Sequence, residues 1–344
     1  MLKREREALA TRNLKTDARE TQSSAAEVER RVAVVILTYN RLHYLLGTVE
    51  RLLRLPERPQ IVVVDNGSAD GTPEAIASRF PMVEIIRLKH NIGAAGRNVG
   101  VQHVRTPFVA LCDDHTWWAP GSLKRAADLL EAYPRLALLT GRLLVGREEK
   151  LDPTCSRMAA SPLCFDPGLP GPAILGFLAG ASVVRRSAFL EVGGFEPRFF
   201  MGGEEVLAAV DLVAAGWGLV YADQIVAYHH PTRYRDALTR RRLLTRNALW
   251  FTWLRRPAAS ALQSSLQTFC SAARDPVSAR GFFDALAGLP WVLKNRRVVP
   301  PHIEEALKQL QEQNSPRRRS FFGAEKQLKK LADRFLKQLF NFNV

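Results

Sequence analysis

The feature that most constrains the fold of this chain is an alternation of short apolar runs with segments of helical periodicity. Each run is apolar along most of its length, and the runs are VAVVIL (32–37), IVVVD (61–65), VEIIRL (83–88) and FVALC (108–112). Between the first two runs apolar residues recur at helical spacing over 45–53, and further helices are expected over 73–79, after residue 93 and over 123–133. Apolar strands that alternate with helices form a parallel sheet covered on both faces.

The organisation of the chain follows from where this alternation begins and ends. We expect an α/β fold with a mostly parallel sheet flanked by helices over residues 32–257, a polar leader over 1–31 that is disordered or helical, and a basic helical C-terminal extension over 258–344. Residues 146–176 hold few periodic positions and are interpreted as one long loop. The first 30 residues lack the apolar stretch of a secretory signal, and no apolar run reaches the ~18 residues of a membrane span.

The net charge of the chain indicates which classes of binding partner it favours. Among its 344 residues, 49 Lys and Arg stand against 34 Asp and Glu, so the formal net charge is +15. Such a basic chain favours an anionic partner, which leaves nucleic acid, anionic lipid and phosphorylated substrates open. The 4 cysteines are too few and too unevenly spaced for a disulfide framework or a zinc ribbon, and they fit a reducing compartment.

Polar residues directly follow the predicted strands, at the sheet edge where ligands bind in α/β folds. They are Thr38, Tyr39, Asn40 and Arg41 after the first strand, Asp65, Asn66, Gly67 and Ser68 after the second, and Asp113, Asp114 and His115 after the fourth. The carboxylate pair Asp113 and Asp114 can hold Mg²⁺ or Mn²⁺, whose other ligands would be phosphate oxygens. Both aspartates can instead cap the helix that starts near Pro120, and Asp65 can serve as a turn residue.

Two further groups carry candidate chemistry. Glu204 and Glu205 follow two glycines at a loop-to-helix junction, where one of them can act as a general base or both can favour the first helical turn electrostatically. His229 and His230 follow an apolar stretch and offer a metal ligand, although such a pair also serves structural roles. Taken alone, each group leaves its role open.

The combination and order of these residues resemble the family 2 glycosyltransferases of the GT-A fold, most closely the bacterial rhamnosyltransferase-like branch. Nine blocks between residues 32 and 257, about two thirds of the chain, carry the resemblance. They are VAVVILTYNR (32–41), VVVDNGSADGT (62–72), NIGAAGRNVG (91–100), LCDDHTWWAPGSL (111–123), FLAGASVVRRSAFLEVGGFEPRFF (177–200), GEE (203–205), AAGW (214–217), YHH (228–230) and RNALWFTWLRRP (246–257).

The resemblance implies a nucleoside-diphosphate sugar as donor, of the UDP or dTDP type. Thr38, Asn40 and Asp65 would contact the base and ribose, and Arg97 would lie beside the diphosphate. The implied donor site also includes Arg41 and Asp113.

The resemblance also implies a divalent cation, Mn²⁺ or Mg²⁺, that bridges the diphosphate. In the family the aspartates of the fourth block bind it, and a late histidine belongs to the same metal site. The corresponding ligands here are Asp113, Asp114, His115 and His229. His115 stands where a third aspartate is commoner, and a histidine can also ligate Mn²⁺.

The implied reaction is sugar transfer with inversion. Glu205, the second acid of the pair with Glu204, takes the place of the family's acceptor base. It would deprotonate the acceptor hydroxyl as that oxygen attacks C1, so a single displacement requires no covalent enzyme intermediate. The following segment VLAAVDL (206–212) lacks the usual Asp and Arg. The acceptor therefore stays open, and a lipid-linked acceptor in the synthesis of bacterial cell-surface polysaccharide or glycolipid is expected.

Two other classes of protein compete with this interpretation. A nucleotidyltransferase has a similar doubly wound sheet, but it would carry a glycine-rich basic loop after the first strand, and LTYNRLHY (37–44) has no glycine. A non-enzymatic nucleic-acid binder is suggested by charge alone. The arginine clusters lack the signatures of an RNA-recognition motif or a zinc finger, so no nucleic-acid partner is expected.

The C-terminal extension ends in a candidate membrane contact. Residues 325–340 place an apolar stripe along one helical face, and residues 315–344 carry eight basic against two acidic groups. Such a basic amphipathic helix can lie in the interface of an anionic membrane, or its stripe can pack on the catalytic domain. We expect a cytoplasmic protein that, in the first case, is peripheral on the inner face of the cell membrane.

Overall fold

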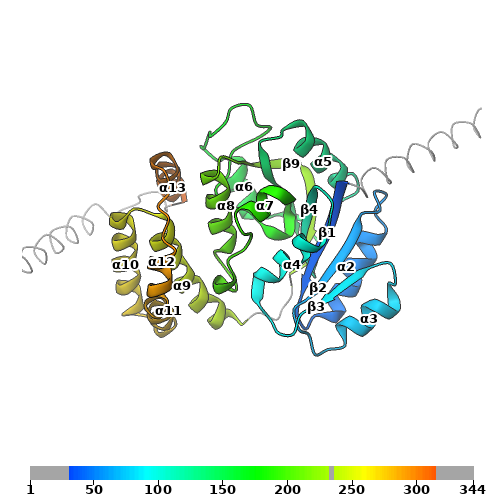
Figure 1. Ribbon diagram of the computed structural model, residues 1–344, viewed down its shortest axis with the longest axis horizontal. Coiled ribbons are helices and arrows are strands. Elements are labelled where there is room, and N and C mark those ends of the chain that lie inside the picture. Colours follow the sequence, from blue (N-terminus) through cyan, green and yellow to red (C-terminus); the bar gives the residue numbers. More distant parts are fainter. Residues whose placement is uncertain (1–30, 232–235, 315–344) are drawn as a thin grey trace, which may run out of the picture. The chain divides into compact units, whose positions relative to one another are not determined.

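The computed structural model describes residues 31–231 and 236–314 (Figure 1). In these ranges one mixed sheet of nine strands has the order β3-β2-β1-β4-β8-β6-β9-β5, with β7 paired to β6. The strands are β1 (Val32–Thr38), β2 (Gln60–Asp65), β3 (Glu84–Arg87), β4 (Phe108–Asp113), β5 (Thr116–Trp118), β6 (Leu136–Val145), β7 (Lys150–Leu151), β8 (Ser182–Arg185) and β9 (Gly218–His229).

One set of helices flanks the sheet, and a second set comes after the last strand in the sequence. The flanking helices are α2 (Leu42–Leu53), α3 (Thr72–Arg79), α4 (Gly96–His103), α5 (Ser122–Ala132), α6 (Pro153–Ala159), α7 (Arg186–Glu191) and α8 (Glu204–Ala214), with 3₁₀ turns η1 (Gly93–Ala95), η2 (Ala179–Ala181) and η3 (Pro197–Phe199). The later helices are α9 (Ala237–Arg255), α10 (Ala258–Ala272), α11 (Pro276–Ala287), α12 (Leu289–Lys294) and α13 (Pro301–Asn314).

The N-terminal half of the sheet is parallel, as the strand–helix alternation predicts. β1 pairs in parallel with β2 on one side and with β4 on the other, and β2 pairs in parallel with β3. Nearly all residues of β1, β2 and β4 are buried, because helices cover both faces of the sheet. The strands and helices predicted up to residue 133 are confirmed, with small shifts at their ends.

The C-terminal half of the sheet is mixed, so the sheet is less parallel than the sequence predicts. β8 lies antiparallel between β4 and β6, and β5 is antiparallel to β9, whereas β6 and β9 are parallel. The sequence between β6 and β8 lacks the regular strand–helix alternation on which the parallel prediction rests, and it holds only β7, the short helix α6 and η2. The expected fold class, an α/β sheet flanked by helices with a helical C-terminal region, is confirmed.

The predicted loop over 146–176 contains two short elements. β7 pairs with the end of β6, and α6 begins at Pro153. The Asp152 side chain caps α6, because it accepts a hydrogen bond from the Thr154 N–H at 2.7 Å. A proline in the first helical turn behind an aspartate cap starts a helix, so the prolines of this stretch do not exclude one.

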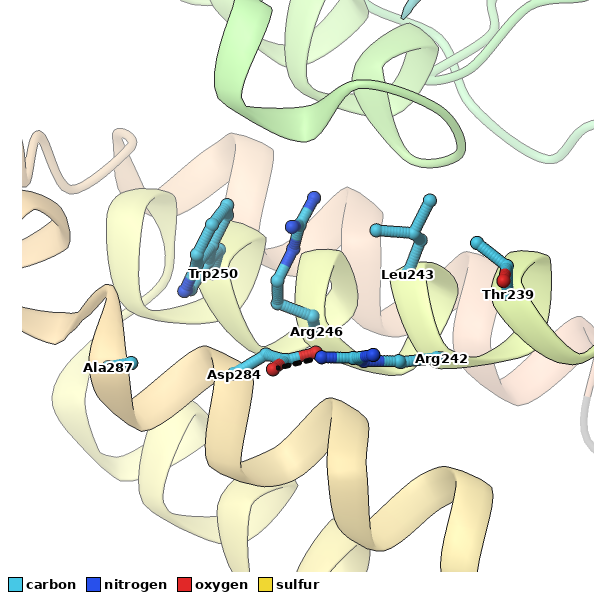
Figure 2. Close-up of a pocket in the computed structure, with 7 residues that line it drawn as sticks. All are labelled: Thr239, Arg242, Leu243, Arg246, Trp250, Asp284 and Ala287. Atoms are coloured by element: carbon cyan, nitrogen blue, oxygen red, sulfur yellow. Dashed lines mark hydrogen bonds and ion pairs between the residues drawn. The ribbon is translucent and has the colours of Figure 1, made fainter.

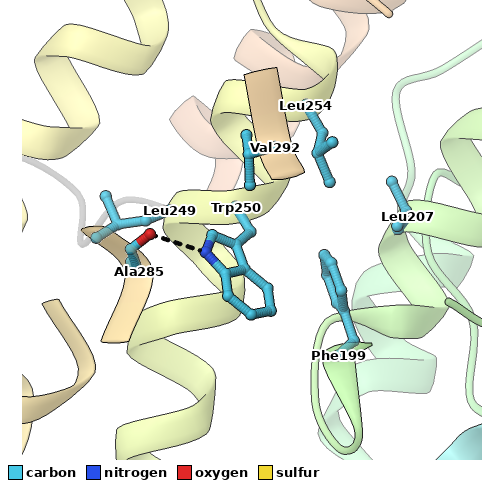
Figure 3. Close-up of a cluster of buried hydrophobic side chains, with 7 residues drawn as sticks. All are labelled: Phe199, Leu207, Leu249, Trp250, Leu254, Ala285 and Val292. Carbon is cyan, nitrogen blue, oxygen red and sulfur yellow. Dashed lines mark hydrogen bonds between the residues drawn. The ribbon is translucent and has the colours of Figure 1, made fainter. Parts of the chain in front are cut away.

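A cluster of buried apolar side chains joins the later helices to α8 and to the loop before it (Figure 3). Phe199 and Leu207 meet Trp250 of α9, whose indole N–H donates to the Ala285 carbonyl at 3.0 Å. The remaining members are Leu249, Leu254, Ala285 and Val292. Helices α9, α11 and α12 are therefore packed against the α8 side of the α/β domain.

A buried ion pair fixes the far end of this helical region. Arg256 donates to Glu304 through Nη2 at 2.8 Å and Nε at 2.9 Å, and both side chains are at most 7% exposed. The chain forms one compact unit up to Glu304, and a second unit follows from Glu305.

Two of the predicted segments lie outside the described residues. They are the leader over 1–31, apart from Arg31, and the amphipathic helix over 325–340. Within the described ranges, residues 258–314 are largely helical, as predicted. No helix of those ranges combines the length and the apolar character that crossing a membrane requires.

Candidate active site

Three strand ends meet at one edge of the sheet. The register places Thr38 of β1 beside Asp65 of β2, and Leu37 of β1 beside Asp113 of β4. The residues that follow these strands therefore lie together, because the carboxyl ends of neighbouring parallel strands face the same edge. The edge predicted to hold the ligand is present.

The side chains of Asn40 and Asp65 accept hydrogen bonds from backbone N–H groups of the turn after β2. Asn40 has a left-handed backbone with φ 51°, its N–H donates to Ser68 Oγ at 2.8 Å, and its Oδ1 accepts from the Ala69 N–H at 2.8 Å. Asp65 is fully buried, and both its carboxylate oxygens lie 3.2 Å from the Ser68 N–H. These two residues, expected at the donor, thus shape the turn in this structure, which is the alternative weighed for Asp65.

The loop after β4 holds a buried aspartate–histidine pair. Asp114 Oδ1 lies 2.6 Å from His115 Nδ1, and the same carboxylate accepts from Thr38 Oγ1 at 3.1 Å and from Arg41 Nη1 at 3.4 Å. His115 Nε2 is buried and has no hydrogen-bond partner among the described residues. The centroid of the His115 ring lies 4.9 Å from that of His229.

Arg97 of α4 pairs with Asp113, the last residue of β4. Burial alone would raise the pKa of Asp113, but the charges of Arg97, His115 and His229 outweigh burial and hold that pKa below its usual value. The site therefore keeps an ionised carboxylate beside two imidazoles at neutral pH.

The donors gathered here are of the kinds that a divalent cation takes. Asp113 supplies a carboxylate oxygen, and the buried Nε2 of His115 is an imidazole nitrogen without a partner in the described structure. Over residues 31–231 and 236–314, no three His, Cys, Asp or Glu side chains converge as a ready-made metal group. Asp113 is turned to Arg97, and Asp114 is turned to Thr38, Arg41 and His115. The predicted ligands are thus neighbours, and their donor atoms are of the kinds that bind a divalent cation. Their side chains, however, point to other protein groups and do not converge on one position.

Glu204 and Glu205 open α8 after two glycines with a left-handed backbone, Gly202 at φ 87° and Gly203 at φ 90°. Oε1 of Glu205 accepts from the Ala179 N–H at 2.8 Å. Burial, and after it the charge of Glu204, raises the pKa of Glu205 to about 7. Burial also raises the pKa of Glu204. A carboxyl group whose pKa is near neutrality can take a proton from a hydroxyl group at physiological pH.

The acids of α8 and the loop after β4 share one electrostatic neighbourhood. The charge of Arg97 opposes the rise in the pKa of Glu205, and the charge of Asp113 adds to it. The pKa of Arg97 is in turn raised by Asp113, Glu205 and Glu204, in that order, against the effect of its burial. The structure thus brings together the base and diphosphate candidates, which are far apart in the sequence.

Asn247 of α9 is a supporting residue that the sequence analysis does not identify. Its side chain is fully buried, and Nδ2 donates to the carbonyls of three loop residues, Phe199 at 2.8 Å, Met201 at 3.2 Å and Gly202 at 2.6 Å. The Phe200 carbonyl accepts from the Ala94 N–H at 2.7 Å. The available signal is the Arg-Asn pair that opens the ninth block, but its partners lie more than forty residues earlier, where no local spacing reveals them.

Asn66 is a second supporting residue, and it joins β2 to the segment before α4. Its Nδ2 donates to Asn91 Oδ1 at 2.8 Å and to the Gly93 carbonyl at 3.0 Å, and its Oδ1 accepts from the Ile92 N–H at 3.0 Å. These contacts hold the turn that leads to Arg97. In the sequence, Asn66 is recognisable only as a polar residue that follows a predicted strand.

Comparisons with known proteins find similar sequences and a similar fold. The family model described as "Glycosyl transferase family 2" matches residues 33–193. Over 234 residues the chain is 29% identical to an N-acetylglucosaminyl-diphospho-decaprenol L-rhamnosyltransferase of Mycobacterium tuberculosis, and the match covers 57% of this chain and 75% of that protein. Over 222 residues it is 31% identical to a pre-mycofactocin glycosyltransferase of the same organism, covering 62% of this chain and 45% of the relative.

A solved structure supports the fold. The mannosyltransferase of Pyrobaculum calidifontis in complex with GDP-Man and Mn²⁺ aligns with a TM-score of 0.51 at 19% identity, over 90% of this chain and 81% of that one. At this level of identity the likeness concerns the fold alone, and it agrees with the GT-A fold expected from the sequence.

Proposed function

The chain belongs to glycosyl transferase family 2, whose domain it carries over residues 33–193, and from this premise we propose an inverting, metal-dependent transfer to a lipid-linked acceptor. The donor is a nucleoside-diphosphate sugar of the UDP or dTDP type, and the product belongs to bacterial cell-surface glycan synthesis. The rhamnosyltransferase relative is named for an acceptor in which a sugar is joined to a lipid through a diphosphate. This chemistry supports a lipid-linked acceptor here.

The observation that carries the proposal is the position of Glu205, a base candidate with a pKa of about 7, in the field of the Arg97–Asp113 pair. Glu205 takes the proton of the acceptor hydroxyl as its oxygen bonds to the anomeric carbon. The bond from that carbon to the diphosphate breaks on the opposite face of the sugar, and the electron pair leaves with the nucleoside diphosphate. One displacement of this kind inverts the anomeric configuration. Arg97 stabilises the charge that develops on the leaving diphosphate.

Asp113, His115 and His229 are the residues that would hold the divalent cation. A bound cation acts as a Lewis acid toward the leaving diphosphate. We assign Asp114 to positioning, because its carboxylate accepts from His115 Nδ1, whereas Nε2 of the same ring is buried and has no partner in the described structure. This assignment differs from the sequence-based expectation that Asp114 is itself a ligand.

A donor panel tests the proposed function. Purified full-length protein is incubated with UDP-, dTDP- and GDP-sugars, and the released nucleoside diphosphate is measured with an isoprenoid-diphosphate acceptor, in Mn²⁺ or Mg²⁺ and in excess chelator. We expect one UDP- or dTDP-sugar to be consumed with cation and the rate to fall to background in chelator, with recovery on add-back. Full turnover in chelator would contradict metal dependence, and no turnover of any nucleotide sugar would contradict the proposed function.

The proposed location is the cytoplasm, with the inner face of the cell membrane as the place of reaction. It is supported by the eight basic and two acidic groups of residues 315–344, since basic residues near an anionic surface contribute about 1 kcal/mol each. Co-sedimentation with anionic vesicles, comparing the full chain with a version that ends at Ser315, tests it. Binding should be lost on truncation, whereas equal binding by both proteins would refute a role for this segment.

A further inference from the structure

A pocket of about 290 Å³ lies along α9, with one wall from α11 (Figure 2). Its lining residues are Thr239, Arg242, Leu243, Arg246, Trp250, Asp284 and Ala287. The members from α9 recur at helical spacing, and Figure 2 shows Thr239, Leu243, Arg246 and Trp250 projecting from the same face of that helix. None of these residues belongs to the catalytic edge described above.

The charges of the pocket do not balance, because its lining carries two arginines and one aspartate. Arg242 binds Asp284 in a two-pronged pair, with Nε to Oδ2 at 2.5 Å and Nη2 to Oδ1 at 2.8 Å. Arg246 stacks over the Trp250 ring at 4.3 Å. Among the described residues, the hydrogen bonds of its side chain reach only uncharged oxygens, at Arg198, Phe199 and Asn247.

An excess of positive charge in a concavity favours an anion. Burial lowers the pKa of Arg246, and the charge of Asp284 opposes that effect only in part. The guanidinium stays charged nonetheless, because its pKa begins far above neutrality. A phosphate oxygen would accept charge-assisted hydrogen bonds from it.

The pocket adjoins the acceptor side of the catalytic edge. Arg246 donates to the carbonyls of Arg198 and Phe199 at 2.9 and 3.0 Å, at the start of the loop that leads into Glu204 and Glu205. The charge of Arg240, on the same helix, lowers the pKa of Glu204. The donor diphosphate is assigned to Arg97, on a different element. A second anionic group held near the base would therefore belong to the acceptor.

We propose that the pocket of α9 and α11, anchored by Arg246, binds the phosphate through which the acceptor sugar is joined to its lipid. This inference rests on the proposed function, since it presumes a lipid-diphosphate acceptor. A bound phosphate fixes the acceptor at one point while the sugar reaches Glu205. Leu243 lines the same pocket and offers an apolar contact to the first part of the lipid.

Direct binding tests the site without any turnover. Farnesyl diphosphate below its micellar concentration is titrated into full-length protein by calorimetry, in chelator so that metal-mediated binding at the donor site is suppressed. Arg246→Gln should weaken binding by about tenfold or more, since charged hydrogen bonds are the strong ones, and Arg246→Lys should retain part of the affinity. Asp284→Asn should tighten binding, because it removes the only carboxylate of the pocket. Arg241→Gln is the control, since Arg241 pairs with Asp275 outside the pocket.

The direction of the change in affinity in each variant tests the proposal. Equal affinity in all variants, or a loss in Asp284→Asn as large as in Arg246→Gln, would overturn the proposal, since the second result indicates a structural effect. Inorganic pyrophosphate that binds as tightly as farnesyl diphosphate would overturn the assignment to a lipid acceptor. The donor panel measures the proposed function separately, so donor turnover with unchanged farnesyl diphosphate binding would reject this site alone.

Discussion

At the scale of single residues, Glu205 differs from Glu204 in what surrounds its carboxylate. Glu205 accepts from the Ala179 N–H, and its pKa responds to the charges of Arg97 and of Asp113, the last residue of β4. Glu204 has one buried oxygen with no hydrogen-bond partner in the described structure, and its pKa responds to Arg97 and, less strongly, to Arg240 of α9. Both acids therefore respond to Arg97, and they differ in the backbone hydrogen bond from Ala179 and in the second charge that acts on each.

Replacing Glu205 by glutamine should abolish the base and leave the fold intact, because the amide oxygen can still accept from Ala179. We expect Glu205→Gln to lower kcat by at least about 10²-fold with unchanged donor affinity. Steady-state kinetics and donor titration measure both quantities, and Glu204→Gln is the matched control. A larger loss of kcat in Glu204→Gln would place the base one residue earlier.

The raised pKa of Glu205 predicts a pH dependence. Only its ionised form accepts a proton, so kcat should rise with pH and level off above about 7. Stability should move the opposite way: the folded-state pKa lies above the unfolded one, so the contribution is present at low pH and is lost as pH rises through about 7. In melting curves, the melting temperature of Glu205→Gln relative to that of the wild type should be higher at pH 8 than at pH 5. A flat rate profile with no relative gain would contradict both statements.

Asp114 should act on metal affinity through His115. Asp114→Asn removes the charge that His115 Nδ1 contacts, and such outer partners typically change metal affinity by about 10- to 100-fold. Electron paramagnetic resonance of free Mn²⁺ measures the affinity, with Asp128→Asn as an exposed control. Unchanged affinity would remove Asp114 from the site, and a loss as complete as that in His115→Ala would make it a ligand.

At the scale of elements, the loop over 198–203 is held from two sides. Asn247 of α9 binds three of its carbonyls, and the Ala94 N–H of η1 binds a fourth. Gly93 permits this approach, because a Cβ there would lie 2.0 Å from the Phe200 oxygen. The loop therefore links the segment that leads to Arg97 with α8, the helix that carries the proposed base.

Loosening this loop should affect catalysis more than donor binding. Asn247→Ala leaves buried carbonyls without donors, which costs about 1–3 kcal/mol for each group left unsatisfied. We expect a lower unfolding midpoint in urea and a lower kcat, with the donor KM unchanged. Asn295→Ala is the control, because that exposed side chain donates only to Trp291 one turn earlier. A folded Asn247→Ala protein with full kcat would show that the loop does not position the base.

Local sequence patterns predict some of these elements and contacts but not others. Period and composition predict the strands β1 to β4, the helices α2 to α5, the strand ends and the residues of the acidic motifs, because these depend on neighbours in the sequence. The antiparallel entry of β8, the use of Asn40 and Asp65 in a turn, and the hold of Asn247 on a distant loop depend on contacts between remote segments. The periodicity of the sequence does not reveal contacts between remote segments, which are seen only in the structure.

At the scale of the whole molecule, the two halves of the proposed reaction come from different parts of the chain. The ends of β1, β2 and β4 and the start of α4 surround the Arg97–Asp113 pair, where the donor diphosphate is assigned. The start of α8 and the arginines of α9 form the proposed acceptor side. The cluster around Trp250 packs these helices on the α/β domain and so fixes α9 relative to the proposed base (Figure 3).

In the proposed reaction, this edge transfers a sugar from a nucleotide donor in a single displacement by an activated acceptor hydroxyl. The most direct measurement is a proton NMR time course of the reaction with the accepted donor, which follows the donor's anomeric signal and that of the first product together. We predict that the product forms at the rate at which donor disappears and with the opposite anomeric configuration. A product that retains the donor configuration, or donor consumption without a glycosylated product, would contradict the account.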